Sequence, residues 1–387
     1  MPVPTRRHPR LAAALLAFAA TLLPALAAGS DQDATVREAV DAAVKPVIER
    51  YGIPGLAVAV TIDGRRHFMD YGVASKDHRI PVTRETLFEL GSISKTFTAT
   101  LATLAAVEDR LSLTDPVGRH MPELKGSALD RVRLLDLATH TAGGFPLQLP
   151  AAVKDQKQLI AYYRAWTPKA PPGTQRSYAN PSIGLLGLAT ARAMGASFET
   201  LAGQLFRDLG LQHTFIDVPE AEMASYAWGY GRDGKPVRVS DALLAAEAYG
   251  VKSNAVDMLR FLEANMGVGP VPEKLARALR ATRTGYSRSG GLIQDLVWEH
   301  YPYPVALDTL VAGNTMNQKV HPAAAIDPPM APRDDVIVNK TGSTLGFGAY
   351  VAFVPGKRIG IVMLANKAYP NEARVEAAHR VLSRLTE

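Results

Sequence analysis

The chain has 387 residues, 47% of them hydrophobic and 21% charged, which is the composition of a folded globular protein with a substantial core. Its formal net charge is +6 and the charges are interspersed, so we expect neither nucleic acid nor an anionic membrane surface as a partner. The chain contains no cysteine, which excludes disulfides, thiol catalysis and cysteine-bound metal.

Residues 1–27 have the pattern of a secretory signal peptide. Three arginines precede an apolar run from Leu11 to about Leu26, and Ala25-Leu26-Ala27 fits a small-x-small cleavage site. The run contains Pro24 and is short for a membrane span of about 20 residues, so we expect a leader that is removed and no membrane anchor. The mature protein, residues 28–387, is therefore predicted to be periplasmic.

The next elements can be placed from the spacing of apolar residues. Helical spacing predicts an amphipathic helix over Asp31–Tyr51. Two strand-like runs, Gly55–Ile62 and Arg65–Ala74, flank the turn Asp63-Gly64 and predict a hairpin. A second helix is expected over Ser92–Asp109, directly after a short strand.

The middle of the chain, about 110–235, is predicted to be mainly helical, and the C-terminal part returns to strands. One strand is expected over Asp335–Asn339. A hairpin pairs Gly348–Pro355 with Arg358–Asn366, and a closing helix is expected over Glu372–Leu385.

Strands at both ends of the chain predict one antiparallel sheet that is built from both termini and flanked by helices, with an inserted all-helical subdomain. This is an α/β (α+β) fold. We expect residues 28–387 to form a single catalytic unit. Its α/β part would comprise about 28–109 and 236–387, and its helical part about 110–235.

The first chemical motif is Ser92-Ile93-Ser94-Lys95, at the start of the second predicted helix. Residues three apart lie on one face of a helix, so the lysine can act on the serine hydroxyl. A serine needs a neighbouring base to become a nucleophile, and a helix N-terminus favours developing negative charge. The pattern also describes a capping serine with a solvated lysine, but no other Ser-x-x-Lys occurs in the chain.

The second motif is Tyr178-Ala179-Asn180. A phenol has an ordinary pKa near 10, and two neighbouring lysines would lower that pKa by favouring the phenolate. The asparagine amide can both donate and accept a hydrogen bond. By itself the motif also fits a buried tyrosine with a capping asparagine, and Tyr369-Pro370-Asn371 repeats the pattern.

The third motif is Lys340-Thr341-Gly342, at the end of a predicted strand. A strand can hold the lysine and threonine beside a cleft, and the glycine lets a ligand approach the backbone. The alternative is an ordinary strand that ends in a turn.

Taken in this order, the three motifs resemble those of the penicillin-recognising serine enzymes, and class C β-lactamases in particular. The resemblance covers nearly the whole mature chain. It is carried by the nucleophile segment, an active-site loop, the end of the Ω-loop and the last strands and helix: Phe88–Thr98, Leu137–Gln148, Ala246–Ser253, Gly346–Pro355 and Ala365–Arg374.

The resemblance implies a β-lactamase/transpeptidase-like fold and roles for the motif residues. Ser92 would be the acylated nucleophile. Lys95 and Tyr178 would move its proton and later activate the hydrolytic water. Lys340, with Thr341, would hold the substrate carboxylate and bias Tyr178.

The resemblance also implies residues that contact the substrate around the reacting bond. They are Gln148 and Asn180 for the side-chain amide, Tyr249 for packing on that side chain, the N–H groups of Ser92 and Ser343 for the oxyanion, and Asn371 and Arg374 at the carboxylate end. The chain departs from the family pattern at Leu345, where a small or polar residue is usual. It also departs at Ala245, which replaces an acidic residue, and over Asp295-Leu-Val-Trp298.

The resemblance implies hydrolysis of the amide bond of cephalosporins and penicillins, which gives resistance to β-lactam antibiotics. We expect a monomer that acts on this small-molecule substrate without a metal or cofactor. A zinc enzyme is disfavoured because the nine histidines are scattered and form no His-x-His pair.

Three alternatives share the fold. A D-alanyl-D-alanine carboxypeptidase or transpeptidase has the same three motifs, and Gln148 with the Ω-loop segment favours the lactamase over it. A serine esterase usually lacks an intact Lys-Thr-Gly. A sensor domain without turnover would not need the complete set of Ser92, Lys95, Tyr178 and Lys340.

Overall fold

The computed structural model describes Met1, residues 12–316 and residues 319–387, with side chains from Asp31 onward. Residues 2–11, which hold the arginines of the predicted signal peptide, lie outside the described residues. Helix α1 (Ala12–Tyr51) begins earlier than the predicted start at Asp31, because alanine and leucine strongly favour helical backbone. Within the described part of the chain, no helix is both long enough and apolar enough to cross a membrane.

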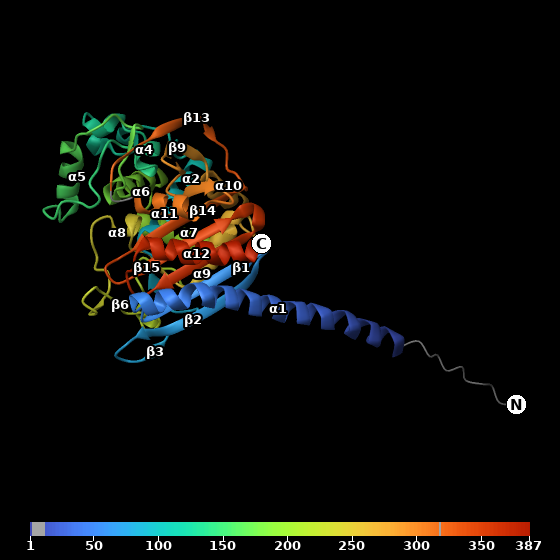
Figure 1. Ribbon diagram of the computed structural model, residues 1–387. Coiled ribbons are helices and arrows are strands. Elements are labelled where there is room, and N and C mark those ends of the chain that lie inside the picture. Colours follow the sequence, from blue (N-terminus) through green and yellow to red (C-terminus); the bar gives the residue numbers. More distant parts are fainter. Residues whose placement is uncertain (2–11, 317–318) are drawn as a thin grey trace.

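A ten-stranded sheet forms the centre of the described fold (Figure 1), and every strand pairs antiparallel with its neighbours. In spatial order the strands are β13 (Ala324–Met330), β9 (Gly285–Ser289), β10 (Leu292–Gln294), β11 (Glu299–Pro302), β14 (Val336–Ser343), β15 (Gly348–Val354), β16 (Ile359–Ala365), β1 (Gly55–Ile62), β2 (Arg65–Ser75) and β3 (Ile80–Pro81).

The sheet is built from both termini, as predicted. Strand β1 pairs with the C-terminal strand β16 in the register Leu56↔Ala365 to Ile62↔Ile359. Both predicted hairpins form, β1–β2 and β15–β16, and β14 extends the predicted strand as far as Ser343. The sequence did not indicate β9, β10, β11 and β13. In β9, β10 and β11, polar side chains such as Gln294 and Glu299 are buried, which obscures the apolar alternation of a strand. Strand β13 is mostly exposed and has no buried apolar face.

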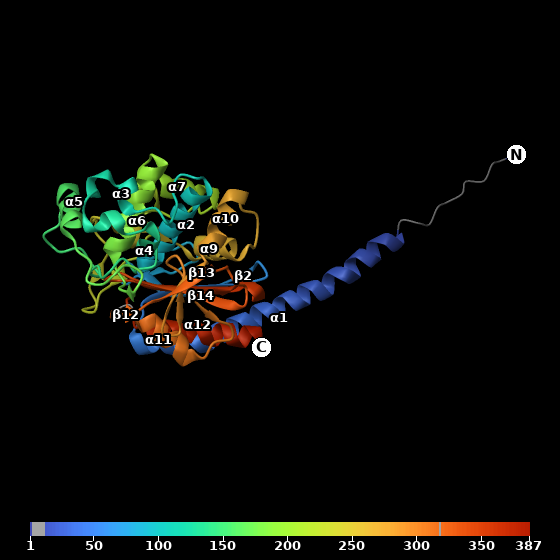
Figure 2. The same cartoon turned by 90° about the horizontal axis from the view of Figure 1, so that it is seen from above.

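Helices cover both faces of the sheet (Figure 2). On one face lie α1, α11 (Leu307–Thr315) and α12 (Asn371–Thr386), the last of which contains the predicted closing helix. On the other face, α9 (Ala255–Met266) packs against β1, β15 and β16. Each interface is a large cluster of buried apolar side chains, so the sheet is buried between two apolar layers.

The remaining helices form the layer beyond α9 (Figures 1 and 2). They are α2 (Ser94–Val107), α3 (Val117–His120), α4 (Leu134–Ala138), α5 (Gln156–Ala165), α6 (Asn180–Met194), α7 (Phe198–Asp208), α8 (Ala245–Ala248) and α10 (Glu273–Ala281). A third apolar cluster joins α2, α4 and α6. The division of the chain at about residues 110 and 235 stays a prediction.

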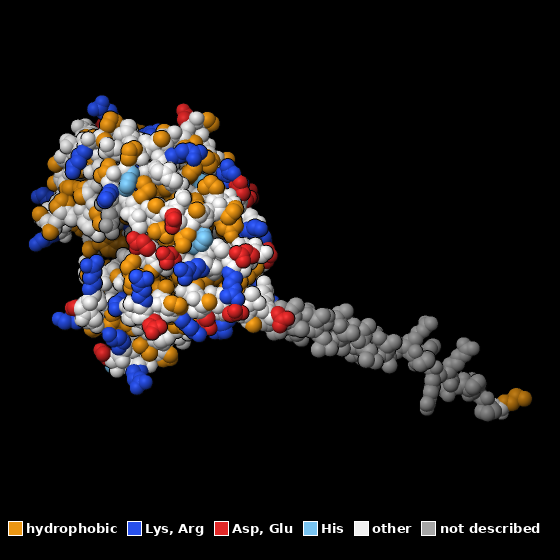
Figure 3. Space-filling view, in the orientation of Figure 1, with side chains coloured by type: hydrophobic (Ala, Val, Ile, Leu, Met, Phe, Trp, Pro, Cys, Tyr) orange, Lys and Arg blue, Asp and Glu red, His pale blue; other side chains and the backbone are white. Residues whose placement is uncertain are grey.

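Short pairings and turns complete the chain. Three strand pairs join distant segments: β4 (Phe88–Glu89) with β8 (Lys252–Ser253), β5 (Gln175–Arg176) with β12 (His321–Pro322), and β6 (Gly229–Tyr230) with β7 (Pro236–Val237). Single 3-10 turns include η1 (Gly91–Ile93), η2 (Pro122–Leu124), η3 (Ala128–Arg131), η4 (Glu220–Glu222) and η6 (Pro355–Lys357). On the face shown in Figure 3, basic and acidic side chains are intermixed.

Helix α2, which carries Lys95, is enclosed by other helices. It contacts α6, α8 and α10, and its alanines and threonines are small enough to let these helices approach. Most of the buried threonine hydroxyls donate to the preceding turn, as in Thr100 Oγ1 to the Thr96 carbonyl at 2.8 Å, and Thr98 Oγ1 donates to the Glu247 carbonyl of α8 at 2.6 Å. The first turn of α2 is therefore held in a fixed position.

Candidate active site

The predicted nucleophile lies at the junction of three elements. The chain leaves β4, passes through Gly91 with a left-handed φ of +54°, and forms the 3-10 turn η1 before α2. The helix predicted over Ser92–Asp109 therefore begins at Ser94, and Ser92 lies in the preceding turn, half-buried. Glycine adopts this φ without strain, which allows the sharp change of direction ahead of the serine.

Lys95 points back onto Ser92 from the first turn of α2. Its ammonium group donates to the Ser92 Oγ at 2.9 Å and to the Ala248 carbonyl at 2.7 Å, and the side chain is fully buried. Burial is the largest influence on this group and lowers the pKa of Lys95 to about 8. Lys340 acts in the same direction and Tyr178 opposes it. A lysine with this pKa can release a proton near neutral pH.

Tyr178 immediately precedes α6, and the packing of α6 on α2 brings its ring beside two lysines. The centre of the ring lies 5.2 Å from Lys95 Nζ and 5.0 Å from Lys340 Nζ. Burial raises the pKa of Tyr178, but Lys340 and Lys95 outweigh it and the pKa falls to about 8. The Ser92 hydroxyl lowers the pKa of Tyr178 further, although the Tyr178 hydroxyl makes no hydrogen bond of normal geometry to a described residue.

Lys340 approaches from the sheet. It is fully buried on β14, and its ammonium group donates to the Thr341 carbonyl at 3.2 Å. Thr341 is also buried. The structure thus brings together Ser92, Lys95, Tyr178 and Lys340 from η1, α2, the start of α6 and β14.

The end of β14 lies directly against the nucleophile segment. A Cβ atom at Gly91 would lie 2.4 Å from the Ser343 nitrogen, and one at Gly342 would lie 1.9 Å from the Leu90 carbonyl oxygen. Only glycine fits at both positions, because any larger residue would force these two backbones apart. This close approach puts the Ser343 nitrogen beside the segment that leads into Ser92.

A cavity of about 180 Å³ lies on one side of these residues and holds three of the predicted substrate contacts: Gln148, Asn180 and Tyr249. Asn180 Nδ2 donates to Gln148 Oε1 at 2.9 Å. The Asn180 Oδ1 atom is buried and accepts no hydrogen bond from the described residues. A buried acceptor of this kind suits an amide N–H of a ligand.

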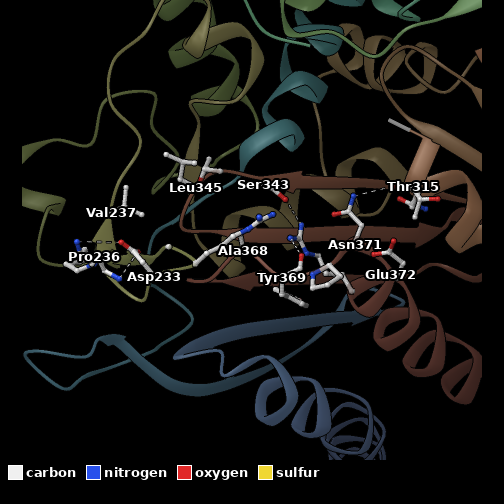
Figure 4. A pocket seen from close by; sticks show the side chains of 17 residues that line it. Asp233, Pro236, Val237, Thr315, Ser343, Leu345, Ala368, Tyr369, Asn371 and Glu372 are labelled. Atoms are coloured by element: carbon white, nitrogen blue, oxygen red, sulfur yellow. Dashed lines mark hydrogen bonds and ion pairs between the residues drawn. The ribbon is translucent and has the colours of Figure 1, made fainter. Parts of the chain in front are cut away.

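A larger cavity of about 1210 Å³ lies at the other side, where Ser343, Asn371 and Arg374 are part of the lining (Figure 4). Asn371 is half-buried, and its Nδ2 donates to the Asn314 carbonyl at 3.3 Å. Leu345, one of the departures from the family pattern, lines the same cavity and is 79% exposed. Its side chain adds apolar surface to the cavity wall.

Sequence reasoning missed two groups that contact Tyr178. The His140 ring lies 4.2 Å from the Tyr178 ring, centre to centre, and its Nδ1 accepts the Ala179 N–H at 3.2 Å. Burial, followed by Arg176, Lys95 and Lys340, holds the pKa of His140 well below its usual value, so this imidazole is neutral. The Arg176 guanidinium lies 5.7 Å from the Tyr178 ring centre and pairs with Glu299 at 2.7 Å, both side chains being fully buried.

No spacing rule would have marked these residues. His140 and Arg176 lie 38 and 2 positions before Tyr178 in the chain, and Glu299 comes from β11. For His140 the available signal was its place in the segment Leu137–Gln148, which carries the family resemblance.

Known proteins with similar sequences and folds include β-lactamases. The β-lactamase family model matches residues 40–386. A β-lactamase from Pseudomonas fluorescens is 49% identical over 355 residues, covering 91% of this chain and 99% of the relative. A solved class C β-lactamase in complex with cefoxitin has a TM-score of 0.89 at 46% identity, covering 91% of this chain and 99% of that one.

The chain belongs to the β-lactamase family. It is a class C serine β-lactamase and therefore a hydrolase, as the resemblance predicted. The chain is also similar to a D-alanine carboxypeptidase from Burkholderia cenocepacia, with 51% identity and a TM-score of 0.86, covering 90% of this chain and 98% of that one. Relatives of similar identity and fold thus bear both names.

The two buried lysines of this β-lactamase generate a prediction about Tyr178. Lys340→Gln removes the cation that lowers the Tyr178 pKa most, so the ionisation near pH 8 should move to higher pH. The measurement is an ultraviolet titration of phenolate absorbance, taken as the difference between each protein and its Tyr178→Phe counterpart. Lys357→Gln, at an exposed lysine of η6, is the control. An ionisation that stays near pH 8 in Lys340→Gln would contradict the electrostatic assignment.

Proposed function

We propose that this class C β-lactamase opens the β-lactam ring of cephalosporins and penicillins through an acyl-enzyme on Ser92. The observation that carries the proposal is the hydrogen bond of 2.9 Å from Lys95 Nζ to Ser92 Oγ, beside a buried tyrosine with a pKa lowered to about 8. Together they give a serine the neighbouring proton acceptor that nucleophilic attack requires.

In the proposed acylation, Ser92 Oγ attacks the lactam carbonyl carbon while its proton passes to the Lys95–Tyr178 pair. The N–H groups of Ser92 and Ser343 stabilise the resulting oxyanion. The C–N bond then breaks, and the ring nitrogen takes a proton from the same pair. The close packing of Gly91 on Ser343 supports this arrangement, because it puts the Ser343 nitrogen beside the residue that precedes Ser92.

Deacylation reuses the same groups. A water molecule attacks the ester carbonyl carbon and gives its proton to the Lys95–Tyr178 pair, and the C–O bond to Ser92 breaks as Oγ is reprotonated. The electrostatic influence of Lys340 on Tyr178 favours the phenolate form, which can accept the proton of that water.

Substrate binding divides between the two cavities. Gln148 and Asn180 are proposed to bind the side-chain amide, and Tyr249 to pack against that side chain, all in the smaller cavity. Lys340 and Thr341 are proposed to hold the substrate carboxylate, with Asn371 in the larger cavity at the same end. The solved relative that binds cefoxitin supports a β-lactam as the ligand.

A D-alanyl-D-alanine carboxypeptidase activity is the second candidate, because a relative of 51% identity bears that name. Both activities acylate the serine. They differ in how quickly water releases the acyl group from a β-lactam.

We also propose that residues 1–27 are a leader peptide and that the mature protein is periplasmic. The basic and apolar pattern of residues 1–27 supports export to the periplasm and removal of the leader, while the single catalytic unit is proposed to span residues 28–387.

Turnover of a chromogenic cephalosporin tests the function. We expect steady hydrolysis over many cycles, and Ser92→Ala should lower the turnover number by about four orders of magnitude or more because no nucleophile remains. Circular dichroism should show an unchanged fold, since Ser92 is only half-buried. Undiminished hydrolysis by Ser92→Ala would show that Ser92 is not the nucleophile. A single stoichiometric burst by the wild type would mean a long-lived acyl-enzyme and would favour the carboxypeptidase activity.

Tyr178→Phe tests the proposed proton acceptor. Loss of a general base typically costs about 10²- to 10⁴-fold, so we expect deacylation to slow by this order while substrate affinity changes little. Rapid-quench measurement of the acyl-enzyme should show it accumulating. An unchanged turnover number in Tyr178→Phe would exclude this residue from deacylation.

The leader can be tested by N-terminal sequencing of protein recovered from the periplasmic fraction. We expect the mature chain to begin at Ala28, directly after the small-x-small signal. A chain that retains residue 1 in that fraction would show that the leader is not removed.

A further inference from the structure

The peptide group between Gly342 and Ser343 has two ends that face different neighbours. Its nitrogen belongs to Ser343, at the exposed end of β14, where a Cβ on Gly91 would lie 2.4 Å away. Its carbonyl oxygen belongs to Gly342. Because a peptide group is planar, whatever fixes the carbonyl also fixes the direction of the Ser343 N–H.

Arg374 is the side chain that holds this carbonyl. Its Nη1 donates to the Gly342 carbonyl oxygen at 2.7 Å and to Ser343 Oγ at 2.9 Å, and its Nη2 donates to the Tyr369 carbonyl oxygen. The guanidinium also lies 4.7 Å from the centre of the Tyr369 ring. Gly348 makes room for it, since a Cβ there would lie 2.7 Å from Nη2.

The family resemblance predicts that Arg374 binds the substrate at the carboxylate end of the pocket, but its environment favours another role. The residue is only 1% exposed, and the two terminal nitrogens already donate to the protein. The remaining donor, Nε, is buried and bonds to none of the described residues. No ion pair within 4.0 Å joins Arg374 to a described carboxylate, so carbonyl oxygens are its direct partners and Glu372 acts on it only from a greater distance.

We propose that Arg374 is a positioning residue of the oxyanion hole: its guanidinium fixes and polarises the Gly342–Ser343 peptide, whose N–H binds the reacting carbonyl oxygen. A charged donor on the carbonyl oxygen draws electron density from the amide and strengthens its N–H as a donor. The inference rests on the proposed function of Ser92 and Ser343, and it places Arg374 behind the peptide and not in contact with the substrate.

The test uses a matched pair of substrates, a chromogenic cephalosporin and the same compound with its carboxylate blocked as a methyl ester. A donor misplaced by about 1 Å can cost about 100-fold, so Arg374→Gln should lower kcat by about this factor on both compounds. KM should change by a small and similar factor for each. Phenylboronic acid, a serine-directed inhibitor without a carboxylate, should lose affinity in the same variant.

Gly348→Ala provides a second variant that keeps the charge. Its Cβ would displace the guanidinium, so it should give the same loss of kcat on both substrates even if Arg374→Gln fails to fold. The matched control is Arg283→Gln. Arg283 is also buried and donates to a carbonyl, that of Arg333, but it lies near the start of β14 and not at its active-site end. This control should lower stability and leave kcat unchanged.

Two results would overturn the inference. A rise in KM confined to the free carboxylate, with kcat unchanged, would return Arg374 to the role of a carboxylate ligand. Wild-type kinetics in both Arg374→Gln and Gly348→Ala would show that Arg374 neither positions the oxyanion hole nor binds the substrate. Either result, obtained while Ser92→Ala abolishes turnover, would leave the proposed function intact. Full activity of Ser92→Ala would instead contradict the proposed function, on which this inference rests.

Discussion

The burial of two lysine ammonium groups beside one phenol is the constraint on which the rest of this structure depends. Lys95 and Lys340 are both fully buried, although an isolated buried charge is strongly unfavourable. The protein offsets this with carbonyl oxygens, such as that of Ala248, and with the face of the Tyr178 ring. The positive potential of the two ammonium groups would destabilise another cation beside them, but it stabilises the phenolate form of Tyr178. A neutral tyrosine is thereby made acidic enough to exchange protons near neutral pH.

Such a cluster can persist only on a framework that does not relax. Lys95 is on α2, which is enclosed by α6, α8 and α10, while Lys340 is on a central strand between β11 and β15. Neutral His140 fills the space beside Tyr178 without adding charge. The fully buried pair of Arg176 and Glu299 links the segment before Tyr178 to β11. Movement of any of these elements would let water reach the lysines and weaken their effect on the phenol.

The backbone contributes as much as the side chains. Gly91 and Gly342 let two segments far apart in the chain touch, and this contact brings the Ser343 nitrogen beside the nucleophile. Arg374 lies behind that contact, from the first turn of α12, and bonds to the strand end through its carbonyl. Helix α12 packs against β15 and β16, so the C-terminal helix supports the site as well as the core. Electrostatic stabilisation of an oxyanion depends on donors that are already in place before the reaction.

Apolar periodicity along the chain was enough to predict the hairpins β1–β2 and β15–β16 and the helices near Ser92 and at the C-terminus. The three motifs could also be identified from the sequence, because the spacing within each motif and their order along the chain can be read directly. The sequence did not indicate β9, β10 and β11, where buried polar residues such as Glu299 interrupt the alternation, or β13, which is mostly exposed. Folding in three dimensions sets the lowered pKa of Tyr178, the neutral state of His140 and the contacts of Arg374. These depend on desolvation and on partners that mostly lie far apart in the chain, and no local pattern encodes which distant groups will share one buried space.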